Sequence, residues 1–161
     1  MAQSKNPDQK SVLMVCTANQ CRSPMAAALL KQLVQSTEVD PDRWKIDSAG
    51  TWGLDGVPAT RDAIQAIAAQ EIDLSNHHSK IITQTMLAEF NLVLTMEAGQ
   101  KEALQIEFPN FQDKIFMLSE MSAENITIQD PTGKSLQAHH ETIQEISRLI
   151  RQGMDQIRSL A

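Results

Sequence analysis

The chain has 161 residues, of which 42% are hydrophobic and 21% charged, and this predicts one soluble globular domain with a core of its own. A formal net charge of −6 argues against non-specific binding to nucleic acid, although it still allows a locally positive pocket for an anion. The two cysteines, Cys16 and Cys21, are too few for a disulfide framework and favour a reducing compartment.

A polar N-terminal segment, residues 1–10, comes first, and we expect it to be a flexible tail in front of a single domain over residues 11–161. The apolar run behind it is shorter than the ~7–15 residues of a signal peptide's apolar region. No run approaches the roughly 20 apolar residues of a membrane span. We therefore expect a cytoplasmic protein without a membrane partner.

Short apolar runs and amphipathic stretches alternate along the rest of the chain. The runs predict buried strands over residues 12–16, 44–48, 92–95 and 114–118. The amphipathic stretches predict helices over residues 25–35, 59–70, 83–90, 98–108 and 136–159. Because the strands show no clean apolar–polar alternation, we expect both faces of the sheet to be covered. The pattern predicts an α/β domain with a mostly parallel sheet, in which ligands bind beyond the carboxyl ends of the strands.

The stretch CTANQCRSP, residues 16–24, occupies such a strand end and leads into the first predicted helix. A loop of this kind aims backbone N–H groups inward, and the helix N-terminus adds the positive end of its dipole, so that the concavity suits a phosphate. Arg22 can reach back and bind two phosphate oxygens. Cys16 lies at the bottom, where the N–H groups, Arg22 and the Ser23 hydroxyl favour a thiolate, the nucleophile of covalent catalysis.

This stretch, which we name the signature loop, resembles that of the low-molecular-weight protein tyrosine phosphatase family. The resemblance continues through SAGT at residues 48–51, SK at 79–80, NLVLTME at 91–97 and DPTGKS at 130–135, and so covers almost the whole chain behind the tail. It implies a single-domain, three-layer α/β/α fold of the flavodoxin-like type with a four-stranded parallel sheet.

The same resemblance implies the hydrolysis of phosphotyrosine in proteins, and of small aryl phosphates, through a phosphocysteine intermediate and without a cofactor. The expected partners are phosphorylated proteins, with inorganic phosphate or another oxyanion bound in the signature loop. Neither nucleic acid nor a membrane is expected as a partner.

By the resemblance, Cys16 is the nucleophile, Arg22 the phosphate clamp and Asp130 the general acid. A phenol has a pKa near ~10, so a proton from Asp130 removes the cost of expelling a phenolate at neutral pH. The ionised carboxylate then activates the water that hydrolyses the phosphocysteine. The positions implied in substrate binding or loop support are Thr17, Ala18, Asn19, Gln20, Cys21, Ser23, Trp52 and Ser48.

Within that set, Asn19 is expected to hold the loop at a positive φ, which Asn tolerates, with Ser48 as its hydrogen-bonding brace. Cys21 has two open interpretations: in the family the second loop cysteine can form a protective disulfide with the nucleophile, or the thiol is simply packed. Trp52 is either a wall on which an aromatic or guanidinium group stacks, or a residue at the edge of the core.

Two positions depart from the family's usual pattern. Gln20 stands where many members carry an apolar residue and where protein arginine phosphatases carry Thr. Thr132 stands where many members carry an aromatic residue. Both departures predict a flatter, less aromatic rim around the substrate, and they keep a protein arginine phosphatase with the same loop and acid as the main alternative.

Other functions are weaker. The related thioredoxin-linked arsenate reductases need further cysteines, and none follows Cys21. A non-catalytic phosphate-binding module would be expected to lack a member of the catalytic set. The adjacent pairs His77-His78 and His139-His140 make poor metal ligands because neighbouring side chains point apart, so we expect solvated histidines and no metal site.

Overall fold

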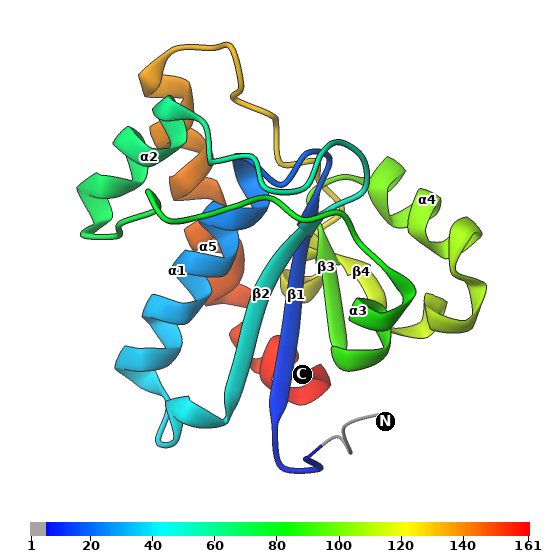
Figure 1. The fold of residues 1–161 in the computed structure, drawn as a ribbon. Helices are drawn as coiled ribbons and strands as arrows, with labels where there is room; N and C mark the ends of the chain where they lie inside the picture. The colour runs from blue at the N-terminus through cyan, green and yellow to red at the C-terminus, as the bar shows by residue number, and fades with distance from the viewer. Residues whose placement is uncertain (1–5) are drawn as a thin grey trace.

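The computed structural model describes residues 6–161, and its sheet consists of four parallel strands in the order β2-β1-β3-β4 (Figure 1). The strands are β1 (Lys10–Cys16), β2 (Trp44–Gly50), β3 (Leu92–Thr95) and β4 (Ile115–Met117). Central β1 pairs with β2 from Lys10 opposite Trp44 to Cys16 opposite Gly50, and with β3 on its other side. The predicted four-stranded parallel sheet is therefore confirmed.

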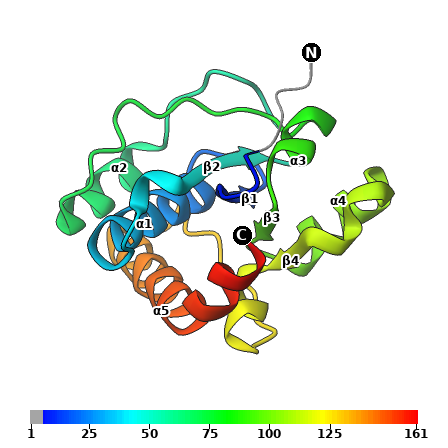
Figure 2. The same ribbon diagram turned by 90° about the horizontal axis from the view of Figure 1, so that it is seen from below.

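Helices cover both faces of the sheet, as the view from below shows (Figure 2). On one face lie α1 (Arg22–Thr37), α2 (Arg61–Ile67) and α5 (Leu136–Leu160). On the other lie α3 (Gln84–Glu89) and α4 (Ala98–Glu107). Residues on β1 alternate between two cores, since Met14 packs in the first and Leu13 in the second. The three layers explain why the strands read as continuous apolar runs.

Several element boundaries differ from the sequence-based prediction. β1 already begins at Lys10, so the sheet takes in the last residue of the segment predicted as a tail, of which residues 1–5 lie outside the described residues. α2 begins only at Arg61, because the Thr60 side chain caps it by accepting a hydrogen bond from the backbone of Ala63 at 3.3 Å. None of the helices that the structure describes could cross a lipid bilayer.

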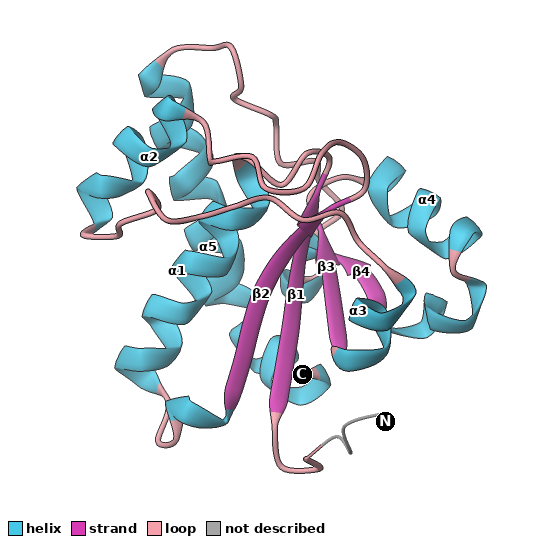
Figure 3. Cartoon of the chain, viewed as in Figure 1, coloured by secondary structure: helices cyan, strands magenta, loops and turns pink. Residues whose placement is uncertain are grey.

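The loops that follow the strands gather at the carboxyl edge of the sheet (Figure 3). α1 leads from β1 to β2 on one side, whereas the chain after β2 returns to β3 on the other side of β1. The strand order thus reverses at the end of β1, which is where parallel α/β sheets bind ligands. The signature loop lies at this point.

Gly50, the last residue of β2, lets the neighbouring chain approach the signature loop closely. A Cβ atom at this position would lie 2.5 Å from the Thr17 carbonyl oxygen and 3.0 Å from the carbonyl carbon of Ala18. Both are backbone atoms, so no side-chain rotation could relieve the overlap. The absence of a side chain at Gly50 therefore determines how near the signature loop sits to β2.

Candidate active site

A pocket of about 140 Å³ opens at the end of β1. Its lining combines the signature loop with one residue before α2 and two from the DPTGKS segment, which we name the acid loop (residues 130–135). None of the lining residues is aromatic, which agrees with the less aromatic rim expected from the sequence. They are Cys16, Thr17, Ala18, Gln20, Cys21, Arg22, Thr60, Asp130 and Thr132.

Cys16 ends β1, and its side chain is only 3% exposed. Its Sγ atom lies 2.9 Å from the hydroxyl of Ser23 in the first turn of α1. The Ser23 hydroxyl also accepts a hydrogen bond from Asn19 Nδ2 at 2.9 Å and donates to the Ala49 carbonyl oxygen at 3.3 Å. Either the Cys16 thiol or the Ser23 hydroxyl can be the donor between them, so Ser23 donates to the sulfur only when its proton turns from Ala49 toward Cys16.

Asn19 is buried at the centre of the signature loop with a φ of +58°. Besides its bond to Ser23, its Nδ2 donates to the Ser48 hydroxyl at 2.8 Å, and its Oδ1 accepts from the backbone N–H of Lys80 at 3.0 Å. The positive φ and the contact with Ser48 are the two features predicted from the sequence. Ser48 and Lys80, from two segments outside the signature loop, thus hold the loop in its strained turn.

Two histidines that we expected on the surface are not there, and that prediction is wrong for them. His77 is half-buried, and its Nε2 donates to the Asn19 carbonyl oxygen at 2.7 Å. Burial lowers the pKa of His77 below its usual value, against the effect of the bond to Asn19. His139 is fully buried in the first turn of α5, where Nδ1 donates to the Ser135 carbonyl at 2.9 Å and Nε2 has no partner.

Arg22 opens α1 and is only 3% exposed, so its orientation depends on the groups around it. Its Nη1 donates to the Glu97 carboxylate and, at 2.8 Å, to the carbonyl oxygen of Ile128. Nη2 lies 3.7 Å from Asp130 Oδ2.

Glu97, which the sequence analysis did not single out, caps the N-terminus of α4 together with Gln100. The Glu-x-x-Gln spacing before an amphipathic stretch could have indicated that cap, but not its contact with Arg22.

Asp130 stands on the pocket rim with its side chain 49% exposed. Although partial burial acts to raise the pKa of Asp130, hydrogen bonds from Thr132 and the charge of Arg22 hold it below its ordinary value. The backbone N–H of Thr132 donates to Oδ1 at 3.0 Å. The acid loop thus presents an ionised carboxylate beside the Arg22 guanidinium.

Cys21 lines the same pocket as Cys16, and both are free, buried thiols. Burial, together with the nearby Asp130 and Cys16, raises the pKa of Cys21 to about 12 despite hydrogen bonds with Thr132 and Thr60. Cys21 therefore stays protonated at neutral pH. Both thiols line one pocket, and a disulfide between them stays a prediction beside the alternative of a packed thiol.

Trp52 does not lie at the edge of the core, since its side chain is 77% exposed. Its backbone N–H donates to the Thr17 carbonyl at 3.0 Å, so the exposed indole stands on a segment tied to the signature loop. Leu54 in the same loop is 72% exposed. Trp52 and Leu54 are therefore exposed, neither lines the pocket around Cys16, and the interpretation of Trp52 as a core-edge residue is excluded.

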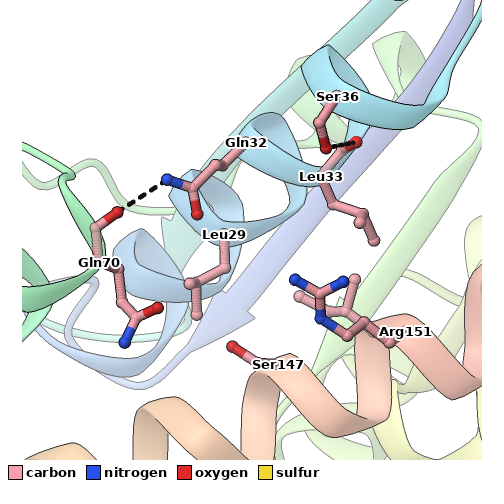
Figure 4. A pocket seen from close by; sticks show the side chains of 8 residues that line it. Leu29, Gln32, Leu33, Ser36, Gln70, Ser147 and Arg151 are labelled. Carbon is pink, nitrogen blue, oxygen red and sulfur yellow. Dashed lines mark hydrogen bonds between the residues drawn. The ribbon is translucent and has the colours of Figure 1, made fainter.

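A second pocket, of about 190 Å³, lies between α1 and α5 at a distance from these residues (Figure 4). Gln32 bridges it by donating to the Gln70 carbonyl at 2.8 Å, and the Arg151 side chain extends over its apolar floor. None of the predicted site residues lines it. The pocket between α1 and α5 is therefore separate from the candidate site around Cys16.

Comparison with known proteins identifies the family. Residues 11–160 match the family model described as low molecular weight phosphotyrosine protein phosphatase. The chain belongs to this family. It is 36% identical over 151 residues to a probable low molecular weight protein-tyrosine-phosphatase, EpsP, of Ralstonia nicotianae, covering 94% of this chain and 98% of the relative. The family resemblance and the fold inferred from the sequence are thereby confirmed.

Two further similarities are informative about the range of the family. The chain is 32% identical over 148 residues to a protein-arginine-phosphatase of Bacillus subtilis, covering 91% of this chain and 96% of the relative. It also resembles the structure of Vibrio vulnificus Wzb in complex with benzylphosphonate, with a TM-score of 0.79 and 26% identity over 94% of this chain and 99% of the other.

Proposed function

We propose that this protein is a cytoplasmic, cysteine-dependent phosphatase that removes phosphate from phosphotyrosine in proteins, with Cys16, Arg22 and Asp130 as its catalytic residues. The observation that carries this proposal is the convergence of those three side chains on one pocket, with Cys16 Sγ 2.9 Å from Ser23. The partners would be phosphorylated proteins, with inorganic phosphate or a related oxyanion as the bound product or inhibitor.

The bound phosphoryl group would lie in the signature loop, where backbone N–H groups and the N-terminus of α1 provide donors. Arg22 is suited to this task because Nη1 is held by Glu97 and Ile128, while Nε and Nη2 would bind the ligand, with Nη2 also 3.7 Å from Asp130. These two nitrogens form a fork that matches two phosphoryl oxygens. A guanidinium anchored at one end is already oriented before the ligand arrives, which reduces the entropy lost on binding.

In the first step, the Cys16 thiolate attacks phosphorus, the bond from phosphorus to the phenolic oxygen breaks, and Asp130 gives its proton to that oxygen. In the second step, the Asp130 carboxylate takes a proton from a water molecule whose oxygen attacks phosphorus. The sulfur–phosphorus bond breaks, and inorganic phosphate and the thiolate are released. The Cys16 sulfur is negatively charged before it attacks phosphorus and again after phosphate is released. Ser23, which lies 2.9 Å away, would donate a hydrogen bond to the sulfur at both points.

Asp130 must be protonated for the first step, yet the hydrogen bonds from Thr132 and the charge of Arg22 lower its pKa. A phosphoryl dianion bound to Arg22 would offset that positive charge and place negative charge near the carboxyl. Both changes raise the pKa of a carboxyl group. Substrate binding would thus favour the protonated form that the reaction needs.

A protein arginine phosphatase is the second candidate, in which the same steps would break a phosphorus–nitrogen bond. The observation that favours it is the polar, non-aromatic pocket wall, where Gln20, Thr60 and Thr132 can hydrogen-bond a guanidinium. The protein arginine phosphatase among the relatives makes this substrate class a direct alternative.

The test compares hydrolysis of a phosphotyrosine peptide and a phosphoarginine peptide of otherwise identical sequence by wild type, Cys16→Ser and Cys21→Ser. We expect faster turnover of the phosphotyrosine peptide, almost complete loss in Cys16→Ser and retained turnover in Cys21→Ser. Faster turnover of the phosphoarginine peptide would replace the first candidate by the second. Normal turnover by Cys16→Ser would contradict covalent catalysis in both.

A further inference from the structure

Gln100 is a buried polar residue of α4, 5% exposed, whose side chain reaches into the signature loop. Its Oε1 accepts two backbone hydrogen bonds, from Met96 at 2.9 Å and from Glu97 at 3.1 Å. Two N–H donors require an acceptor, so the carbonyl oxygen of the amide must face them. The opposite end, Nε2, therefore faces Thr17 Oγ1 at 3.1 Å.

This arrangement determines what the Thr17 hydroxyl does. A hydroxyl group has one proton to donate and two lone pairs that accept. Since Nε2 of Gln100 can only donate, the Thr17 oxygen accepts, and its own proton points away from α4. In the described chain this hydroxyl has no other hydrogen-bond partner. Thr17 follows Cys16 directly, is exposed, and lines the pocket.

We propose that the Thr17 hydroxyl donates a hydrogen bond to a phosphoryl oxygen in the Cys16 pocket, and that Gln100 is a positioning residue that keeps the Thr17 proton directed there. The inference rests on the proposed function and adds a side-chain donor to the backbone donors of the loop. The residue that orients this donor, Gln100 of α4, is 83 positions from Thr17 in the chain.

The neighbouring contact supports this role for the start of α4. Glu97 and Gln100 cap the helix reciprocally, each side chain bonding to the other's backbone. Glu97 also holds Arg22, at the far end of the signature loop, while Gln100 holds Thr17 at its beginning. One helix cap thus contacts both ends of the loop, which couples the position of the Arg22 guanidinium to that of the Thr17 hydroxyl.

The first test replaces the hydroxyl. Thr17→Val keeps the branched shape but has no donor, and Thr17→Ser keeps the donor. A hydrogen bond to a charged group is worth about 1.5–3 kcal/mol, which corresponds to about 10- to 150-fold in an equilibrium constant. We expect Thr17→Val to raise the inhibition constant of inorganic phosphate by that factor and to lower kcat/KM for an aryl phosphate, and Thr17→Ser to stay near wild type.

The second test reverses the direction of the hydrogen bond between residue 100 and Thr17 and keeps the helix cap of α4. In Gln100→Glu, one carboxylate oxygen still accepts from Met96 and Glu97, whereas the other accepts from the Thr17 hydroxyl and turns its proton toward α4. We expect phosphate affinity to fall about as far as in Thr17→Val. Gln105→Glu adds the same charge farther along α4 and should bind phosphate like wild type.

The double variant Thr17→Val/Gln100→Glu separates orientation from charge, because a residue that acts through Thr17 has less to lose once the hydroxyl is gone. We expect the double loss to be well below the product of the two single losses. Independent, multiplying effects would overturn the role of Gln100, and wild-type phosphate affinity in Thr17→Val would overturn the whole inference. Failure of the proposed function itself would appear differently, as a wild-type protein that hydrolyses neither peptide.

Discussion

The Arg22 guanidinium is held from behind by the Glu97 carboxylate, which comes from a residue 75 positions later in the chain. Arg22 is almost completely buried, while Glu97 is partly exposed. The pair therefore does more than neutralise a charge. It fixes Nη1, while Nη2 lies 3.7 Å from Asp130 on the pocket rim, so the guanidinium is held beside the pocket in which a phosphoryl group would bind.

Removing this contact should weaken phosphate binding. In Glu97→Ala, Arg22 loses an oriented, partly buried partner, a change that costs about 1.5–3 kcal/mol for a hydrogen bond to a charged group. We expect kcat/KM for an aryl phosphate to fall by about 10- to 150-fold, with a smaller fall in Glu97→Gln, which keeps an acceptor. Glu89→Gln, in an exposed ion pair with Lys45, is the matched control. Equal kcat/KM in Glu97→Ala and wild type would contradict the orienting role.

Asp130 as a general acid should matter in proportion to how poor the leaving group is. We expect Asp130→Asn to lower kcat/KM by about 10²- to 10⁴-fold for a phenol of high pKa, and by much less for a strongly activated phenol. Rates across a series of aryl phosphates measure this. A uniform loss across the series would show that Asp130 acts on phosphate binding and not on proton transfer.

The pH dependence of the reaction follows from the lowered pKa of Asp130. Burial raises this pKa, but the hydrogen bonds from Thr132 and the charge of Arg22 together lower it by more. The free enzyme needs the protonated acid, whose fraction falls as pH rises above that pKa. We therefore expect kcat/KM for a poor leaving group to decline with rising pH on a limb that is missing in Asp130→Asn. Persistence of the same limb in that variant would assign it to another group.

His77 should make stability pH-dependent. Its pKa is lowered in the folded protein, mainly by burial, so below its ordinary value of about 6.5 the unfolded chain binds the proton more readily. The free energy of unfolding therefore decreases as pH falls through about 6.5 toward the folded pKa. His77→Gln retains a donor for the Asn19 carbonyl but cannot titrate. Urea unfolding between pH 7.5 and 5 should show a shallower slope for this variant, and an unchanged slope would contradict the assignment.

Gly50 and Gly99 offer a paired test of packing. In Gly50→Ala, the new Cβ would meet the Thr17 carbonyl oxygen at 2.5 Å, so the signature loop must shift. Such overpacking typically costs about 1–3 kcal/mol, and we expect lower stability together with weaker phosphate binding. Gly99→Ala in α4 meets nothing within 4 Å and should be neutral or stabilising. Denaturant unfolding and phosphate inhibition check both, and a fully active, stable Gly50→Ala would contradict the close approach.

Local pattern determined a large part of this protein. The apolar runs around Val12 and Val93 and the amphipathic stretches between strands predicted the parallel sheet and its covering helices, because burial on one or two faces imposes its period on the sequence. The order Cys16, Arg22, Ser23 predicted the anion pocket, because a strand, a short loop and a helix start leave little freedom in how those residues can be arranged.

Tertiary structure alone decided how the pocket is held together. Glu97, Gln100 and His77 contact the signature loop from distant segments, and no spacing in the sequence states which helix cap or connecting loop packs against it. For the same reason, the sequence did not reveal that His77 is half-buried, that His139 is buried or that Trp52 is exposed, since the exposure of each side chain depends on which distant segments pack against it. Residue spacing constrains neighbours along the chain, whereas burial and long-range hydrogen bonds exist only once the sheet has brought separate segments to the same edge.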